Sequence, residues 1–361
     1  MPTNLRTEVR DHLGVLRDAW DPLVGTMLLP SAFLRGWWVD HASTGTPAVV
    51  CCFDGDVLVG GAAFELDRPG RGPLSVERVR MLGQGPLAPD HLDVVANPDR
   101  AAAVAAAVVG WLSRPGSRVV DLDGLAADGA LAAALVAAGG PVIDRVGAPF
   151  ASLPDTGEEY LASRPGKLRS TAKRTRKRLE GEGATVRTVG ADDAARALDD
   201  LSRLHDGRWA DGSEFLSAWT RFAAAAADGL AHGDVRISEL VSAEGEVVAT
   251  ELDLLASGPG GTSLAFYQAG RRTEHEWRGA GTALKAAVVM DACDEGVSEY
   301  DLLRGDESYK SDWAEGRREL VRVRTGFGTL GRTVATAATA WKRRQDARAA
   351  AASSAESADQ A

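Results

Sequence analysis

A run of small residues, Arg278-Gly279-Ala280-Gly281-Thr282-Ala283, has the composition of a phosphate-binding loop. It lies between a predicted strand, Thr262–Gln268, and a helix predicted to begin near Thr282. A diphosphate needs several converging backbone N–H groups with no side chain blocking its approach, and a bare loop that enters a helix N-terminus supplies them. The arginine adds a positive charge. An ordinary glycine-rich turn before a helix has the same spacing, so the loop alone leaves both interpretations open.

Tyr309 and Glu251 are the first candidates for moving protons. A phenol carries an accessible proton at neutral pH, and Tyr309 lies six residues beyond the predicted strand end at Leu303. It could equally pack with Trp313, one helical turn further along the chain. Alternation along the predicted strand puts Glu251 and Asp253 on one face, directed toward a polar cleft or toward water.

Asp301 and Asp306 are further candidates for a catalytic carboxylate. Asp301 lies within an apolar run, Tyr300–Leu303, where an unpaired carboxylate would be costly. We therefore expect it to pair with Arg304, Lys310 or a backbone amide. An orienting role fits that position as well as a chemical one.

The whole chain has 361 residues, 45% of them hydrophobic and 25% charged, which favours a folded protein of two domains. It contains no apolar run of the roughly 18 residues that span a membrane, and its start has no apolar signal-peptide core. Its three cysteines and six scattered histidines predict neither a disulfide framework nor a metal site. A net charge of −10 argues against a DNA-binding protein. We expect a cytoplasmic protein without membrane insertion.

Two hairpin patterns give the chain a faint internal repeat. FDGDVLVGGAAFEL around Gly55 resembles SAEGEVVATELDLL around Gly245, and each joins two predicted strands through an acidic-Gly turn. Each hairpin follows helical segments and precedes a further strand, a helix and a strand. We predict an α/β fold with two mixed-sheet domains of similar topology at 1–154 and 155–332. An Ala-rich tail at 333–361 should be helical and then disordered.

A second glycine pattern, Gly326-Phe-Gly-Thr-Leu-Gly331, has the spacing of a dinucleotide-binding turn. That fold also needs a second strand and an acidic residue about 20 residues further on. The Ala-rich, charged tail that follows has no strand pattern, so we assign this segment no cofactor.

The first loop and the segment after it resemble a known family. Arg-x-x-Gly-x-Ala between a strand and a helix is similar to the acetyl-CoA pyrophosphate loop of the GNAT N-acetyltransferases. Glu299–Trp313, which reads EYDLLRGDESYKSDW, resembles the signature of the GNAT branch named after the cellulose-biosynthesis protein CelD. Leu204-His205-x-x-Arg208-Trp209 also resembles that branch. The resemblance covers about 155–325 well and 10–150 loosely, and it implies tandem GNAT folds related to Fem-type peptidyltransferases.

The resemblance implies an acetyltransferase that uses acetyl-CoA as its co-substrate. The strand before the loop should splay from its neighbour, and its exposed backbone should then pair with the pantetheine arm. The implied cofactor-binding residues are Phe266, Tyr267, Gln268, Arg278, Gly279, Ala280, Gly281, Thr282 and Ala283. For this reaction we predict Tyr309, Glu251 and Asp301 as catalytic residues, and Arg304, Asp306, Lys310 and Trp209 as substrate-binding residues. No metal is required.

Several alternatives stay open at this stage. The donor could be an aminoacyl-tRNA, as in Fem-type relatives, or the fold could serve as a non-catalytic scaffold. The basic segment Lys167–Arg178 could be a solvated amphipathic helix, an anion clamp or an RNA contact, and the acidic remainder of the chain counts against RNA. The acceptor could be a small molecule or a carbohydrate-related amine or hydroxyl, because a GNAT fold hosts many substrates.

Overall fold

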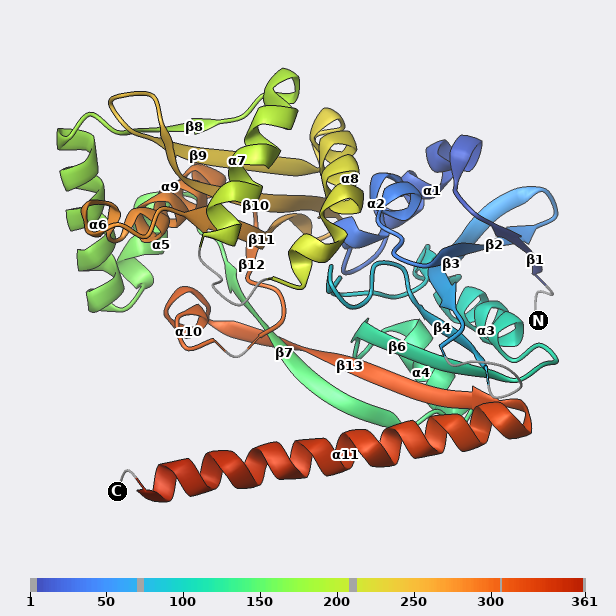
Figure 1. Cartoon of the computed structure of the whole chain (residues 1–361). Coiled ribbons are helices and arrows are strands. Elements are labelled where there is room, and N and C mark those ends of the chain that lie inside the picture. The colour runs from blue at the N-terminus through green and yellow to red at the C-terminus, as the bar shows by residue number, and fades with distance from the viewer. Residues whose placement is uncertain (1–4, 70–74, 208–212, 306, 360–361) are drawn as a thin grey trace.

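The computed structural model describes residues 5–69, 75–207, 213–305 and 307–359. Its strands belong to one continuous mixed sheet (Figure 1). The strands are β1 (Arg6–Arg10), β2 (Thr46–Asp54), β3 (Val57–Asp67), β4 (Glu77–Met81), β5 (Val95–Ala96), β6 (Arg118–Ala126), β7 (Val142–Ser152), β8 (Thr185–Thr188), β9 (Val235–Val241), β10 (Val247–Gly258), β11 (Gly261–Arg271), β12 (Glu299–Asp301) and β13 (Gly316–Phe327). The α-helices are α1 (Arg17–Val24), α2 (Gly36–His41), α3 (Ala101–Leu112), α4 (Ala130–Ala137), α5 (Gly157–Ser163), α6 (Gly166–Gly181), α7 (Ala194–Asp206), α8 (Trp219–Ala231), α9 (Ala280–Asp294), α10 (Lys310–Trp313) and α11 (Gly328–Asp359).

The order of elements repeats along the chain. The first half runs β1–α1–α2–β2–β3–β4–α3–β6–α4–β7, and the second runs β8–α7–α8–β9–β10–β11–α9–β12–α10–β13. Across the sheet the order is β1-β2-β3-β4-β6-β13-β7-β12-β11-β10-β9-β8, with β5 beside β3. If the short β5 is left out, this order is the same from either end once the two halves are interchanged. The last strand of the second half, β13, lies beside β6, and the last strand of the first half, β7, lies beside β12. The predicted tandem α/β fold is confirmed, while the division at 154/155 and 332/333 stays a prediction.

Both predicted hairpins are present. β2 pairs with β3 around Asp54 and Gly55, and β9 pairs with β10 around a turn that contains Gly245. Gly55 and Gly245 have φ of +61° and +87°, the left-handed region that glycine enters without a Cβ clash. The acidic-Gly turns therefore close both hairpins as the sequence predicted, because glycine allows the positive φ that each turn needs.

The basic segment forms α6 and packs as its apolar seam predicts. Leu168, Ala172, Thr175 and Leu179 are its buried residues, and they join a core with α9 and with the strands beneath it. Its Lys and Arg residues lie on the other faces of the helix. This packing fixes α6 against the segment that contains the predicted phosphate loop.

The tail differs from the expectation. Residues 328–359 form the single helix α11, so the predicted disordered end is helical as far as Asp359. Alanine has the highest intrinsic helix propensity, which favours this outcome. The glycine pattern Gly326–Gly331 lies where β13 leads into α11, and it allows close backbone packing there. A Cβ at Gly326 would lie 2.3 Å from the Gly331 carbonyl oxygen, and one at Gly331 would lie 2.3 Å from the Arg118 carbonyl oxygen. Among the described residues, no helix is both long and apolar enough to cross a membrane.

Candidate active site

β11 and β12 separate partway along their length. They pair in parallel only from Ser263 with Glu299 to Ala265 with Asp301. Beyond that point β12 ends, whereas β11 continues to Arg271 with β10 on its other side. Within the described chain no strand pairs with this edge of β11 after Ala265. The backbone groups along this edge are therefore available to an extended ligand, as the resemblance implied.

The helix α9 begins beside this opening. Gly279 is its N-cap, with φ of +86°, and a Cβ there would lie 3.0 Å from Thr175 Cγ2 on α6. Gly281 and Thr282, in the first helical turn, line a cavity of about 300 Å³. The first-turn amides of a helix lack intrahelical partners and carry the positive end of its dipole. This cavity, which we call the loop cavity, thus has the chemistry of a diphosphate site.

Two cations and two hydroxyl groups reinforce that character. Lys167 and Thr171 come from the first half of α6, and Arg271 comes from the end of β11. Thr282 supplies the second hydroxyl. Farther along α6, Arg178 donates to the carbonyl oxygens of Glu276 (2.9 Å) and Arg278 (3.1 Å), and so fixes the segment before α9. The basic helix is therefore a wall of the cavity.

The predicted loop residues divide into two groups. Gly281 and Thr282 line the cavity, and Gly279 provides the turn that starts the helix. Ala280 and Ala283 are instead buried in the core beneath α9. The Arg278 side chain is exposed and lies outside the cavity lining, so its charge is farther from the site than the spacing suggested.

A second cavity of about 280 Å³ adjoins the first. Phe266, Ala269 and Tyr309 line both, so the two form one path along the open edge of β11. We call this one the junction cavity because the segment 86–90 of the first half lines it together with Leu302–Arg304. Tyr309, 38% exposed, stands at the N-cap of α10 between the two cavities. Its predicted position on the side of the loop agrees with this arrangement, and its role stays a prediction.

Glu251 lies in a buried polar cluster beneath α9. It is 2% exposed and lines the loop cavity, and its Oε1 accepts from Lys285 Nζ (3.3 Å) and from the Tyr300 hydroxyl (3.2 Å). Burial raises the pKa of Glu251, and the charge of Lys285 opposes that rise. Asp253, on the same face, is fully buried, and burial followed by the charge of Glu251 raises its pKa well above the usual range. One proton shared between these two carboxyls would relieve their repulsion.

Asp301 has two polar partners in this structure, and its role stays a prediction. Its Oδ2 pairs with His91 Nε2 at 2.7 Å, and its Oδ1 accepts from the Leu303 amide at 2.7 Å. The expected backbone partner is present, but the charged partner is His91 from the other half in place of Arg304 or Lys310. Burial acts to raise the pKa of Asp301, but His91, the Leu303 amide and the charge of Arg318 together lower it below the usual value. Asp301 lines neither cavity.

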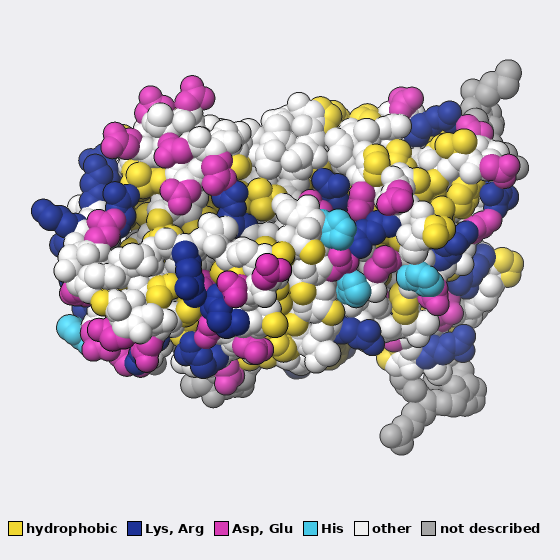
Figure 2. Space-filling model, turned by 90° about the horizontal axis from the view of Figure 1, so that it is seen from above, with side chains coloured by type: hydrophobic (Ala, Val, Ile, Leu, Met, Phe, Trp, Pro, Cys, Tyr) yellow, Lys and Arg dark blue, Asp and Glu magenta, His cyan; other side chains and the backbone are white. Residues whose placement is uncertain are grey.

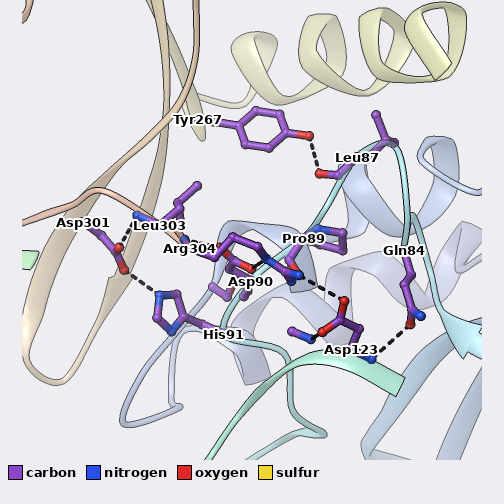
Figure 3. Close-up of polar contacts among 12 residues, drawn as sticks. Gln84, Leu87, Pro89, Asp90, His91, Asp123, Tyr267, Asp301, Leu303 and Arg304 are labelled. Atoms are coloured by element: carbon purple, nitrogen blue, oxygen red, sulfur yellow. Dashed lines mark hydrogen bonds and ion pairs between the residues drawn. The ribbon is translucent and has the colours of Figure 1, made fainter. Parts of the chain in front are cut away.

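Arg304 joins the two halves of the molecule (Figure 3). Its backbone amide and its Nε both donate to Asp90, the former at 2.6 Å, and its Nη1 donates to Asp123 Oδ2 at 3.1 Å. Its Nη2 donates to the Pro89 carbonyl at 2.7 Å. The guanidinium lines the junction cavity and its donors serve this network, and its role in binding a substrate stays a prediction.

Tyr267 and Lys310 also serve the junction. The Tyr267 hydroxyl donates to the Leu87 carbonyl at 2.6 Å, and its ring contacts Phe33 and Trp38 of the first half. Lys310 Nζ is buried, pairs with Glu307 (3.0 Å) and donates to backbone carbonyls after β12. Both residues hold the walls of the junction cavity with their polar atoms. The remaining strand residues predicted to bind the cofactor, Phe266 and Gln268, line this cavity as well, with Phe266 reaching the loop cavity too.

Two predicted substrate residues, Trp209 and Asp306, lie outside the residues that the structure describes. Sequence reasoning missed Lys285, Tyr300 and His91. A single lysine within the apolar helical run ALKAAVV was a usable signal for Lys285, because a buried cation must find an acid. His91 gave no such signal, since its partner is more than 200 residues away.

Comparison with known proteins agrees with this geometry. Residues 166–311 match the family model described as an acetyltransferase (GNAT) domain. The chain contains a GNAT acetyltransferase domain. This match makes the protein an acyltransferase. The matched residues include Tyr309 and the lining of the loop cavity except Asp312 and Trp313. A search of curated proteins finds no match for the chain.

Solved structures show the same fold at low identity. FemX has a TM-score of 0.60 at 11% identity, over 84% of this chain and 95% of that one. A conserved protein of unknown function from Bacteroides thetaiotaomicron has a TM-score of 0.58 at 10% identity, over 88% and 99%. L-PGS from Bacillus licheniformis has a TM-score of 0.51 at 14% identity, over 73% and 80%. The likeness to FemX extends across both halves, as the repeated topology requires.

Proposed function

We propose that the protein transfers an acetyl group from acetyl-CoA directly to an amine or hydroxyl of its acceptor. The observation that supports this most strongly is the opening between β11 and β12, which leads to the first turn of α9. That combination provides free backbone groups for an extended arm and bare amides for a diphosphate. Lys167 and Arg271 add the charge that a diphosphate needs. No group of His, Cys, Asp and Glu suited to a metal ion occurs among the described residues.

The residues along the path divide the chemistry. The acceptor nitrogen attacks the thioester carbonyl carbon, the C–S bond breaks, and the sulfur leaves as a thiolate that needs a proton. Tyr309, between the two cavities, gives that proton. The acceptor loses a proton at the same time, and Glu251 is the buried carboxylate in the cavity lining that can take it. Backbone N–H groups of β11 beyond Ala265 stabilise the developing oxyanion.

Calorimetry with a matched pair of variants tests cofactor binding. Gly281→Glu puts a carboxylate beside the first-turn amides and should abolish saturable acetyl-CoA binding. Gly281→Ala adds only a methyl group, 3.2 Å from the flexible Arg271 side chain, and should retain it. Wild-type protein that binds no acetyl-CoA, or a Glu variant that binds it as tightly as the Ala variant, contradicts the proposal.

A thiol-release assay tests Tyr309. Tyr309→Phe keeps the ring and removes the proton, so kcat should fall about 10²–10⁴-fold with little change in the KM for acetyl-CoA. Trp313→Phe alters a neighbouring buried ring without removing an acid. Because Trp313 also lines the loop cavity, this variant controls for packing on α10 through kcat, and a change in its KM for acetyl-CoA does not count against Tyr309. An unchanged kcat in Tyr309→Phe would favour a non-catalytic role for the site.

An aminoacyl-tRNA donor is the second candidate. It is favoured by the basic helix α6, whose exposed cations flank the loop cavity, and by the fold shared with FemX. On the face seen in Figure 2, however, Lys and Arg are interspersed with Asp and Glu, as we expect for a protein that does not bind RNA broadly. Binding of aminoacyl-tRNA in place of acetyl-CoA would decide for this candidate.

The acceptor site is proposed to be the junction cavity. It adjoins the loop cavity, which Glu251 lines, at Phe266, Ala269 and Tyr309, and both halves of the chain form its wall. Ligand sites commonly occur at such junctions. The CelD-like signature suggests a carbohydrate-related acceptor, and a cytoplasmic location would give it acetyl-CoA. A thiol-release screen over sugar amines, amino acids and polyamines would identify the acceptor class.

A further inference from the structure

The chain turns away from β11 immediately after β12, and this turn creates the opening that the proposed cofactor would enter. β12 ends at Asp301, and the next four residues continue beside β7. The Leu302 amide donates to the Pro149 carbonyl at 2.8 Å, and the Gly305 amide donates to the Gly147 carbonyl at 3.1 Å. Both acceptors belong to β7, so these two hydrogen bonds direct the turn away from the edge of β11.

The two amides between them are bound by carboxylates (Figure 3). The Leu303 amide donates to Asp301 Oδ1 at 2.7 Å, and the Arg304 amide donates to Asp90 Oδ2 at 2.6 Å. Four consecutive backbone amides thus have acceptors that are not on β11. A strand pairs with its neighbour through these same backbone groups. The turn therefore cannot extend the pairing with β11 while the four hydrogen bonds are in place.

The backbone of this junction is held in an unusual conformation. Among the described residues, the non-glycine residues with positive φ are Ala88 (+41°), His91 (+53°) and Leu303 (+56°). All three belong to the two segments that meet at the junction between the halves. Residues with a Cβ seldom adopt this region, and they remain there where surrounding contacts impose it. The shape of the turn at Leu303 thus depends on the contacts made by its neighbours.

Asp301 depends on a cation from the first half. Its side chain is buried, and its Oδ2 pairs with His91 Nε2 at 2.7 Å. The charge of Arg318 also favours the Asp301 carboxylate, but Arg318 is itself paired with Glu299 at 2.6 Å. A buried carboxylate is costly without a partner of opposite charge. His91 is therefore the direct ionic partner of the residue at which β12 ends.

His91 lies in a segment that is fixed to the first half on both sides. The Ser31 hydroxyl donates to the Asp90 carbonyl at 2.9 Å. The Leu92 amide donates to the carbonyl of Gly124, on β6, at 2.9 Å. The segment can therefore transmit the position of the first half to the turn after β12, through the Asp90 carboxylate and through His91.

We propose that Asp90 and His91 of the first half hold open the gap between β11 and β12, which makes His91 a positioning residue for acetyl-CoA. His91 lines neither the loop cavity nor the junction cavity, so it acts through Asp301. The inference rests on the proposed function. It assigns the first half a role in binding a cofactor whose diphosphate site belongs to the second half.

Calorimetry on the full chain with His91→Asn tests this role. Asparagine enters the left-handed region more readily than most residues, so the variant keeps the backbone conformation and loses the charge and the reach to Asp301. The end of β12 can then move toward β11. If the gap is open in about a tenth of the molecules, the Kd for acetyl-CoA rises about tenfold. The Kd for 3′-phospho-ADP, the part of coenzyme A without the pantetheine arm, should stay within about twofold, because that fragment needs only the loop cavity.

Kinetics by thiol release should show the same separation. Saturating acetyl-CoA selects the open form, so the KM for acetyl-CoA in His91→Asn should rise about tenfold while kcat stays within about twofold. His91→Gln places an amide donor about as far from the backbone as Nε2, and it should lose less affinity than His91→Asn. Binding of 3′-phospho-ADP also verifies that each variant is folded.

Arg17→Gln is the matched control. Arg17 Nη1 on α1 donates to Asp228 Oδ2 on α8 at 2.8 Å, so this ion pair also joins the two halves. Arg17 lines neither cavity. The control should lower the melting temperature and leave the Kd for acetyl-CoA within about twofold.

The inference is overturned by an unchanged Kd for acetyl-CoA in His91→Asn, by equal losses for acetyl-CoA and 3′-phospho-ADP, or by equal losses in Arg17→Gln and His91→Asn. A loss in His91→Gln as large as in His91→Asn would also overturn it. Wild-type protein that binds no acetyl-CoA refutes the proposed function and this inference together, whereas the other outcomes refute the inference alone.

Discussion

Replacing Arg304 by methionine should destabilise the protein strongly, because Arg304 balances a buried charge. Asp90 is fully buried, and Arg304 provides its backbone amide and its guanidinium to that carboxylate. The variant would keep the amide but leave Asp90 without its cation. Removing one member of a buried ion pair typically costs about 3–5 kcal/mol. We expect the free energy of unfolding of Arg304→Met to fall by that amount at pH 8.

The same variant should recover part of its stability in acid. Burial already raises the pKa of Asp90, against the opposing charge of Arg304, so the loss of that charge must raise it further. A carboxyl whose pKa is higher in the folded state binds more protons there than in the unfolded chain. Stability then falls as pH rises. The difference between wild type and Arg304→Met should therefore be smaller at pH 5 than at pH 8.

Urea unfolding followed by tryptophan fluorescence measures both effects, and a double variant supplies the control. Asp90→Asn/Arg304→Met removes both charges, so it should be clearly more stable at pH 8 than Arg304→Met alone. The reasoning is refuted if Arg304→Met costs less than about 1 kcal/mol, the size of an exposed pair. It is also refuted if the loss is the same at both pH values.

Three further changes probe the junction and the site. Burial acts to lower the pKa of His91, but Asp301 and Asp90 together raise it above the ordinary value of 6.5. The stability that His91 contributes is therefore complete below pH 6.5 and is lost as pH rises through the raised value. His91→Gln should thus lower the melting temperature most between pH 3.8, the ordinary pKa of Asp301, and pH 6.5, and a pH-independent difference would contradict this. Gly270→Ala should cost about 1–3 kcal/mol because its Cβ would lie 2.7 Å from the His205 amide nitrogen, whereas Gly260→Ala, with open space around it, should be nearly neutral in urea unfolding. Lys285→Met should raise the pKa of Glu251 and shift the acidic limb of the pH–kcat profile upward, and an unshifted limb would exclude Glu251 as the base.

Local sequence patterns determined the parts of the fold that depend on neighbouring residues. Acidic-Gly turns between alternating apolar runs were sufficient to predict both hairpins, because turn geometry and strand period are local properties. The apolar seam of α6 was predicted for the same reason. The repeat of hairpin, strand, helix and strand also led to the tandem α/β fold. The loop before α9 could be located because bare amides at a helix N-terminus leave a compositional trace.

Residues far apart in the sequence determined the site itself. The sequence located the predicted loop at the start of α9. Only the structure shows that β12 ends at Asp301, and that the edge of β11 facing β12 is unpaired beyond Ala265 in the described chain. The partner of Asp301 is His91, and Arg304 meets Asp90 and Asp123, all contributed by the other half of the chain. A charged side chain can be recognised in a sequence, whereas the partner it meets depends on how the two halves pack. The sequence therefore determined which groups could bind and react, and the tertiary structure decided which of them share a cavity and which neutralise one another, because burial and pairing are properties of the packed molecule.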